Sequence, residues 1–220
     1  MKFMVGTGPM KVMIVSSGNI KNKKQLSEIS ETADKIVCAD AGAAHLKSMG
    51  IFPDVIIGDF DSLSPEDLNF FKHHNVDLVP HPPDKDITDT ELAATWAVEQ
   101  NADEIIFLGA SGSRLDHTLA NIMLLKKMAD LNINARIIDD HNCIYLVLDH
   151  LTLPGRPGEF LSIIPMTEEV SGVTLEGLEF PLKDAQMEMG SSLGISNRFA
   201  SKEAVISIRQ GILIVTKSKD

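Results

Sequence analysis

The segment DVIIGDFDS at residues 54–62 joins a short apolar run to two aspartates, Asp59 and Asp61. The apolar part predicts a buried β-strand, because its apolar residues do not alternate with polar ones. Similar apolar runs recur at 11–17, 35–40, 76–81, 104–110 and 135–140. Helical patterns lie between them, at 22–33, 43–50, 64–74, 88–101 and 116–132. This alternation predicts an α/β domain with a mostly parallel sheet, covered by helices on both faces.

Two of the predicted helices carry start signals. Ser64 precedes Pro65 and two acidic residues, which is typical of an N-cap serine followed by proline in the first turn. Thr88 and Glu91 have the spacing of a capping box. Capping alone would explain the presence of Thr88 and Glu91.

After about residue 142 the helical pattern stops. Apolar runs separated by glycine and proline turns predict strands at 143–153, 159–166, 172–180, 204–210 and 211–218. We expect the last two to form a hairpin. The change in composition predicts an α/β domain over residues 10–141 and a small all-β sandwich over 142–220.

Composition limits the classes of partner. The chain has 220 residues, 44% hydrophobic and 23% charged, with a net charge of −11. This acidity argues against a nucleic-acid binder or an anionic-membrane binder and permits a cationic small substrate. The two cysteines, Cys38 and Cys143, do not make a disulfide framework. No signal peptide or apolar stretch of roughly 20 residues is evident, so we expect a cytoplasmic protein.

Acidic residues gather where the predicted strands end. Asp40, Asp59 and Asp61 follow strands, and a further group, Asp84–Lys85–Asp86 with Asp89, precedes a helix. A single aspartate after a strand is usually a turn residue or a cap, but parallel strands bring such ends to one edge. In extended backbone, Asp59 and Asp61 would point to the same side. Carboxylates that gather need neutralisation, which predicts a divalent cation such as Mg²⁺ and a phosphate-bearing substrate.

The loop at 109–114, GASGSR, links a strand to a helix. Its glycines allow backbone N–H groups to approach a phosphate, and Arg114 is suited to clamp one. Asp116 is placed either to cap the helix or to serve the site, and His117 and Asn121 share a helix face. The loop matches neither the dinucleotide-binding glycine pattern nor the P-loop.

Together these segments resemble the thiamine pyrophosphokinase family. The resemblance rests on GDFDS at 58–62, on Asp-x-Asp-x-Thr-Asp-x-Glu at 84–91, on Gly-x-x-Gly-x-Arg-x-Asp-His-x-x-x-Asn at 109–121, and on Ser196-Asn197. It implies an N-terminal α/β domain that binds ATP, a C-terminal β-sandwich that binds thiamine, and a homodimer. It also implies transfer of pyrophosphate from ATP to the thiamine hydroxyl, giving thiamine diphosphate and AMP.

The resemblance also implies roles for individual residues. Asp59, Asp61 and Asp86 would bind Mg²⁺ and, with Asp89, form the catalytic group. Thiamine would be held by Ser196, Asn197 and an aromatic residue at Phe180. The nucleotide would be bound by a larger set: Asp40, Lys85, Thr88, Arg114, Asp116, His117 and Asn121. Either Asp89 or Asp61 could accept the hydroxyl proton.

The chain departs from the family pattern at three positions. Ala41 and Ser113 stand where glycine is common, and Phe180 stands where tryptophan or tyrosine is often found. Two other functions remain open at this point. One is a metal-dependent phosphohydrolase of the Asp-x-Asp type, which would leave residues 109–121 unexplained. The other is a nucleotide or thiamine sensor without turnover.

Overall fold

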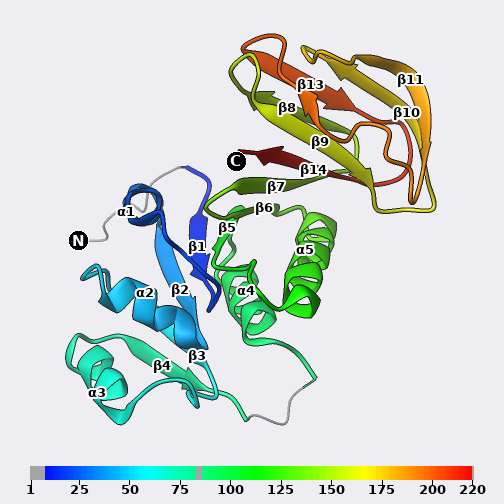
Figure 1. Cartoon of the computed structure of the whole chain (residues 1–220). Helices are drawn as coiled ribbons and strands as arrows, with labels where there is room; N and C mark the ends of the chain where they lie inside the picture. Colours follow the sequence, from blue (N-terminus) through cyan, green and yellow to red (C-terminus); the bar gives the residue numbers. More distant parts are fainter. Residues whose placement is uncertain (1–7, 83–85, 220) are drawn as a thin grey trace. The chain divides into compact units, whose positions relative to one another are not determined.

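The computed structural model describes residues 8–82 and 86–219 (Figure 1). The chain divides into two compact units, Met1–Asp140 and His141–Asp220, which we call unit 1 and unit 2 and describe separately. Within the described ranges, no helix combines the length and the apolar character needed to cross a bilayer.

Unit 1 contains a six-stranded sheet in which every neighbouring pair of strands is parallel. Its order is β6-β5-β1-β2-β3-β4. The strands are β1 (Lys11–Val15), β2 (Lys35–Ala39), β3 (Val55–Gly58), β4 (Asp77–Pro80), β5 (Glu104–Leu108) and β6 (Asn134–Ile138). Because β1 lies between β2 and β5, the strand order reverses around it. This reversal creates a crevice at the carboxyl ends of β1 and β5.

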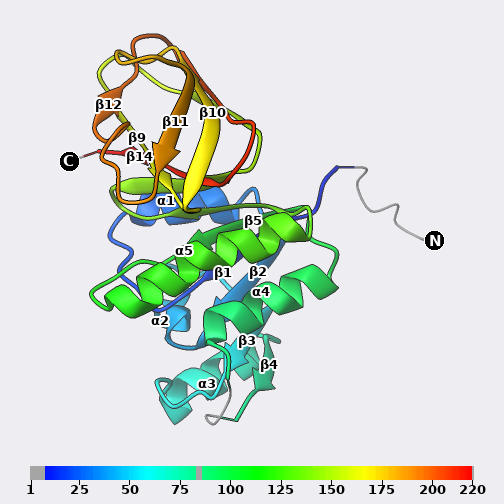
Figure 2. The same ribbon diagram turned by 90° about the vertical axis from the view of Figure 1, so that its right-hand side faces the viewer.

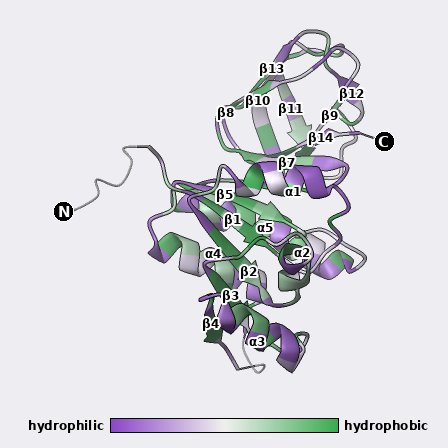
Figure 3. Ribbon diagram, turned by 90° about the vertical axis from the view of Figure 1, so that its left-hand side faces the viewer, coloured by the Kyte–Doolittle hydropathy of each residue, from purple (hydrophilic) through white to green (hydrophobic). Residues whose placement is uncertain are grey.

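Five α-helices cover this sheet: α1 (Lys23–Ser30), α2 (Ala43–Lys47), α3 (Pro65–His73), α4 (Asp89–Glu99) and α5 (Leu115–Asp130). Figures 1 and 2 show α4 and α5 on one face, with α1 and α2 on the other. The central strands are coloured hydrophobic in Figure 3, and Val12, Met13, Ile14 and Val15 of β1 have no exposed surface. Burial on both faces explains the unbroken apolar runs in the sequence.

The predicted helix starts are confirmed. Ser64 Oγ accepts the amide N–H of Asp67 at 3.1 Å ahead of Pro65. Thr88 Oγ1 accepts the amide N–H of Glu91 at 3.2 Å, so Thr88 is the N-cap of α4. The Glu91 carboxylate contacts Lys127 Nζ at 2.8 Å, which ties α4 to α5.

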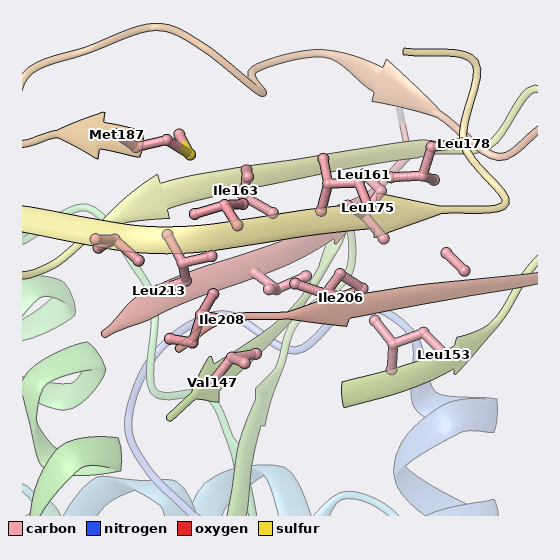
Figure 4. Close-up of a cluster of buried hydrophobic side chains, with 14 of the residues drawn as sticks. Val147, Leu153, Leu161, Ile163, Leu175, Leu178, Met187, Ile206, Ile208 and Leu213 are labelled. Atoms are coloured by element: carbon pink, nitrogen blue, oxygen red, sulfur yellow. The ribbon is translucent and has the colours of Figure 1, made fainter. Parts of the chain in front are cut away.

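Unit 2 consists of two antiparallel sheets. One has the order β12-β9-β14-β7, and the other has the order β11-β10-β13-β8. The strands are β7 (Asn142–Val147), β8 (His150–Pro154), β9 (Phe160–Pro165), β10 (Glu169–Glu176), β11 (Leu182–Glu188), β12 (Asn197–Arg198), β13 (Glu203–Ser207) and β14 (Leu213–Ser218). Both sheets contribute to one apolar core, for example Ile163 and Leu213 from the first and Leu175 and Ile206 from the second (Figure 4).

Two expectations about unit 2 are wrong, and one strand was missed. β13 and β14 do not form a hairpin, because β13 pairs with β10 and β8 whereas β14 pairs with β7 and β9. The run at 143–153 is two strands in different sheets, separated by the exposed residues Leu148 and Asp149. Strand β11 was not predicted, because only Met187 in it is buried and its sequence lacks an apolar alternation.

Candidate active site

Two adjoining hollows open at the carboxyl edge of the parallel sheet in unit 1. The larger, of about 430 Å³, is lined by residues that follow β1, β2 and β3 and by the start of α4. The smaller, of about 220 Å³, is lined by the segment after β1 and by the loop at 109–114. They share five lining residues: Ser16, Ser17, Thr90, Arg114 and His117. They therefore form one cleft at the point where the strand order reverses, which is the usual ligand position in such sheets.

An acidic cluster borders the larger hollow. Asp40, Asp59 and Asp61 each place one ligand atom within 4.8 Å of the other two. Asp40 is 8% exposed, and its Oδ1 has no hydrogen-bond partner within the described ranges. Burial raises the pKa of Asp40, as do the charges of Asp89 and Asp59, against the opposing effect of hydrogen bonds with Ser62 and Ala41. A buried, unpaired oxygen beside two further carboxylates fits a hard divalent cation that takes oxygen ligands.

A turn brings Asp59 and Asp61 together. β3 ends at Gly58, and Phe60 has a left-handed backbone with a φ of 63°. The amide N–H of Asp61 donates to Asp59 Oδ1 at 3.1 Å. The expectation of extended backbone at these aspartates is therefore wrong. A tight turn lets the carboxylates of this segment approach each other more closely than successive residues on one face of a strand.

Gly58 leaves room for two more carboxylates. A Cβ atom at this position would lie 2.9 Å from Asp40 Cβ and 3.2 Å from Asp89 Oδ1. Asp89 is the first residue of α4 and lines the larger hollow. A side chain at residue 58 would displace Asp40 or Asp89, so the glycine is required by the approach of these two residues.

The loop at 109–114 packs tightly against the segment that follows β1. The amides of Ser16 and Gly18 donate to the carbonyls of Leu108 and Gly109, each at 2.8 Å. A Cβ at Gly18 would lie 2.1 Å from the carbonyl oxygen of Ser111. Gly109 has a φ of 62°, and a Cβ there would lie 2.4 Å from Ser16 O. These two glycines therefore allow the two backbones to meet beneath the smaller hollow.

Polar side chains hold the same loop from the helix side. Asn121 is 6% exposed, and its Nδ2 donates to the carbonyl of Ala110 at 2.7 Å. Thr118 Oγ1 accepts the amide N–H of Gly112 at 3.2 Å and donates to the Arg114 carbonyl at 3.1 Å. Asn121 thus orders the rim of the smaller hollow, which it also lines.

Arg114 and Asp116 form an exposed ion pair at the start of α5. Arg114 Nη2 lies 2.6 Å from Asp116 Oδ2, and the two side chains are 70% and 64% exposed. The hydrogen bond from Arg114 lowers the pKa of the Asp116 carboxyl. Arg114 stands at the N-cap position of α5, where no side chain caps the helix. Asp116 thus pairs with Arg114 and is hydrogen-bonded to the backbone of His117 in the first turn of α5, so neither of its two predicted roles is excluded.

The remaining predicted residues of unit 1 have separate positions. His117 is exposed and lines both hollows, and Thr88 lines the larger one. Asp86 is exposed and does not belong to the acidic cluster found among the described residues, where Asp40 takes the third place. Lys85 falls within 83–85, outside the described residues.

The predicted thiamine residues all lie in unit 2. Phe180 is 65% exposed, and Asn197 is 2% exposed. The side chain of Asn197 makes two hydrogen bonds with the backbone of Phe180: its Oδ1 accepts from the amide N–H at 3.0 Å, and its Nδ2 donates to the carbonyl at 2.8 Å. Ser196 has a left-handed φ of 58°, and its amide N–H donates to Ser162 Oγ at 2.9 Å. The structure thus brings Asn197 and Phe180 together across 17 residues of sequence.

Sequence reasoning missed part of the cleft. Ser16, Ser17, Gly18 and Thr90 line it but were not among the expected site residues. The signal was available, because Ser-Ser-Gly directly follows the apolar run of β1. A small polar segment after a buried parallel strand lies at the ligand-binding edge of the sheet.

Comparison with known proteins identifies the family. The model of the thiamin pyrophosphokinase catalytic domain matches residues 26–137, and that of the thiamin pyrophosphokinase vitamin B1 binding domain matches residues 150–213. The thiamine pyrophosphokinase of Bacillus subtilis (strain 168) is 32% identical over 222 residues, covering 96% of this chain and 100% of the relative.

Solved structures agree with this match. A crystal structure of thiamine pyrophosphokinase from Bacillus subtilis superposes with a TM-score of 0.84 at 31% identity, covering 96% of this chain and 99% of that one. One from Geobacillus thermodenitrificans gives a TM-score of 0.83 at 33% identity, covering 96% and 98%. Both parts of the chain and the cleft-forming motifs are thus accounted for by one family. The chain belongs to the thiamine pyrophosphokinase family.

Proposed function

We propose that this protein transfers the pyrophosphoryl group of ATP to the hydroxyl of thiamine, giving thiamine diphosphate and AMP. The observation that carries the proposal is the acidic cluster of Asp40, Asp59 and Asp61 beside the glycine-containing loop at 109–114. Both border one cleft in the unit that matches the family's catalytic domain. Phosphoryl transfer needs such a combination of charge neutralisation and positioning more than it needs a covalent intermediate.

Asp40, Asp59 and Asp61 would hold Mg²⁺. Bound there, the ion would neutralise phosphate oxygens that the carboxylates alone would repel. The unpaired Oδ1 of Asp40 supports its inclusion as a ligand. Asp86, the third ligand implied by the family resemblance, stays a prediction that variants can test against Asp40.

The smaller hollow would bind the polyphosphate of ATP. Backbone N–H groups of the loop at 109–114 and the N-terminus of α5 favour an anion there. Arg114 would exchange its ion pair with Asp116 for a phosphate oxygen, which its exposure permits. Lys85, Thr88 and His117 are proposed as further nucleotide contacts.

Asp89 and Asp61 remain the two candidates for accepting the hydroxyl proton of thiamine. Asp89 lies beside Asp40 over Gly58, within the larger hollow. This position places Asp89 beside the carboxylates that would hold the metal ion, where the reacting groups would meet.

Unit 2 would bind thiamine and form the homodimer. The finer division that we propose is an α/β catalytic domain at 10–141 and a thiamine-binding β-sandwich at 142–220. Phe180 offers an exposed aromatic face, and Ser196 lies next to Asn197, the residue that holds Phe180.

The exposed apolar side chains Met189, Leu193 and Ile195 support a protein interface on this unit. Light scattering of the purified protein would test whether it is a homodimer. We propose a cytoplasmic location, where ATP is supplied.

One incubation tests the function. The protein is supplied with ATP and Mg²⁺, with and without thiamine, and the nucleotides are separated by chromatography. We expect AMP and thiamine diphosphate in equal amounts, and only when thiamine is present. Thiamine-independent phosphate release would indicate a phosphohydrolase, and binding of both ligands without turnover would indicate a sensor.

A further inference from the structure

We infer that Asn197 is a positioning residue, which fixes the exposed ring of Phe180 for thiamine and does not itself touch the ligand. The inference rests on the proposed function, since thiamine is the ligand considered. It differs from the expectation drawn from sequence, in which Asn197 held thiamine directly.

The side-chain amide of Asn197 already makes hydrogen bonds within the protein. Its Oδ1 accepts from the backbone N–H groups of Phe180 at 3.0 Å and Arg198 at 2.8 Å, which uses both lone pairs of a carbonyl oxygen. Its Nδ2 donates to the carbonyl of Phe180 at 2.8 Å. With 2% of its surface exposed, the side chain offers a ligand almost no surface.

Asn197 fixes the segment that carries Phe180. The backbone of Phe180 is bound through both its N–H and its carbonyl, and the amide of Glu179 donates to the Arg198 carbonyl at 2.8 Å. Two residues earlier, Leu178 is 5% exposed and anchors the segment in the core, whereas Phe180 is 65% exposed. The chain thus holds the backbone rigidly while the aromatic side chain faces outward.

Such an arrangement suits a ligand that is both aromatic and cationic. The face of an aromatic ring attracts a cation such as a thiazolium, and the attraction is lost if the ring moves away. Holding the ring before binding also avoids the entropic cost of ordering it in the complex. This segment lies inside the region that matches the family's vitamin B1 binding domain.

The full-length protein allows a direct test through Asn197→Asp. This change keeps an acceptor for the Phe180 N–H but sets a carboxylate against the Phe180 carbonyl. It therefore breaks one of the two hydrogen bonds between residue 197 and the backbone of Phe180. We expect the thiamine Kd from calorimetry to rise about tenfold, with the KM for ATP and kcat within about twofold. Lowering the pH should restore part of the affinity, because a protonated carboxyl can again donate to that carbonyl.

The decisive comparison is with Phe180→Ala. If Asn197 acts through the ring, Asn197→Asp should weaken thiamine binding little further in the Phe180→Ala background. A direct contact predicts the opposite: the new anion would hold cationic thiamine at least as tightly, and the two changes would add. Either result would overturn the inference. Gln186→Glu, an exposed charge change on β11, serves as the control.

Two further measurements keep the test decisive. Hydrogen exchange of the Phe180 amide in the ligand-free protein should be faster in Asn197→Ser, whose shorter side chain cannot reach that N–H, and unchanged exchange would refute the positioning role of Asn197 without reference to thiamine. Failure of the wild-type protein to bind thiamine would instead refute the proposed function. Should Asn197→Asp not fold, Asn197→Ser replaces it, and an equal loss of ATP and thiamine affinity there would mark a purely structural role.

Discussion

The hydroxyl oxygens of Ser16 and Thr90 lie 2.9 Å apart, and both side chains are buried. Ser16 follows β1, and Thr90 lies in the first turn of α4 directly after Asp89. The bond therefore ties the central strand of the sheet to the helix that carries Asp89. Both residues line both hollows, so this bond also fixes the junction between the proposed metal site and the proposed phosphate site.

Thr90→Val should lower the free energy of unfolding by about 1–3 kcal/mol, because it leaves the buried Ser16 hydroxyl without this partner. The measurement is urea denaturation of the wild type and the variant. Combining Thr90→Val with Ser16→Ala should recover part of the loss, since both polar groups are then removed. Strictly additive losses would show that the two hydroxyls do not depend on each other.

Asp40→Asn should lower kcat at least about 100-fold while stabilising the metal-free protein at pH 7. The raised pKa means that folded Asp40 holds its proton more tightly than unfolded Asp40, so ionisation disfavours the folded state as pH rises through the folded pKa. The stabilising effect should therefore vanish below the ordinary aspartate pKa of about 4. Thermal denaturation in the presence of a chelator measures the stabilisation at neutral pH and its disappearance at acidic pH.

Matched variants separate this effect from a general loss of charge. Asp59→Asn and Asp61→Asn should also fold and lose most turnover, and added Mg²⁺ should stabilise the wild type more than any of the three variants. Asp77→Asn, at the exposed start of β4, should behave like the wild type. Near-normal activity of both Asp59→Asn and Asp61→Asn at limiting Mg²⁺ would contradict the metal assignment.

Gly18→Ala and Gly112→Ala should differ sharply. A Cβ at Gly18 would lie 2.1 Å from Ser111 O, whereas at Gly112 the nearest neighbouring atom is Gly18 Cα at 3.7 Å. We expect Gly18→Ala to lower the thermal midpoint and to weaken ATP binding, because the loop at 109–114 must move away. Gly112→Ala should keep the wild-type midpoint, and a similar midpoint for both variants would show that the contact at Gly18 can relax.

Phe180→Ala should raise the KM for thiamine by roughly one to two orders of magnitude, from the loss of about 1–3 kcal/mol of aromatic contact. The KM for ATP should stay close to that of the wild type. Phe52→Ala removes another exposed aromatic side chain, in unit 1, and should change neither constant. Equal weakening of ATP and thiamine by Phe180→Ala would assign Phe180 to folding.

The sequence was informative wherever local pattern and burial coincide. The strands β1, β3 and β5 of unit 1 are buried on both faces, so their apolar runs stand out. Ser64 and Thr88 mark helix starts through local bonds. The pairing of the β-strands in unit 2 could not be predicted from such local patterns. β13 and β14 each carry a short apolar run that does not specify a partner strand, and the shared core of the two sheets decides that they separate.

The candidate site could likewise be predicted only in part from the sequence. Motif spacing brought Asp59, Asp61 and Asp89 to one edge, but it could not reveal that Asp40 is buried with an unpaired oxygen. Nor could it show that the amide of Asn197 is occupied by the backbone of Phe180, a partner 17 residues away. Both facts depend on contacts between segments distant in sequence.

The place of β14 in its sheet has a consequence for the order of folding during synthesis. β14 (Leu213–Ser218) lies between β9 and β7 and pairs with both, with Ser218 opposite Asn142. All six strands of the parallel sheet have left the ribosome once residue 138 is clear, so unit 1 can fold early. The first sheet of unit 2 must wait for residue 218, and until then the edges of β7 and β9 that pair with β14 stay open to pairing with other strands.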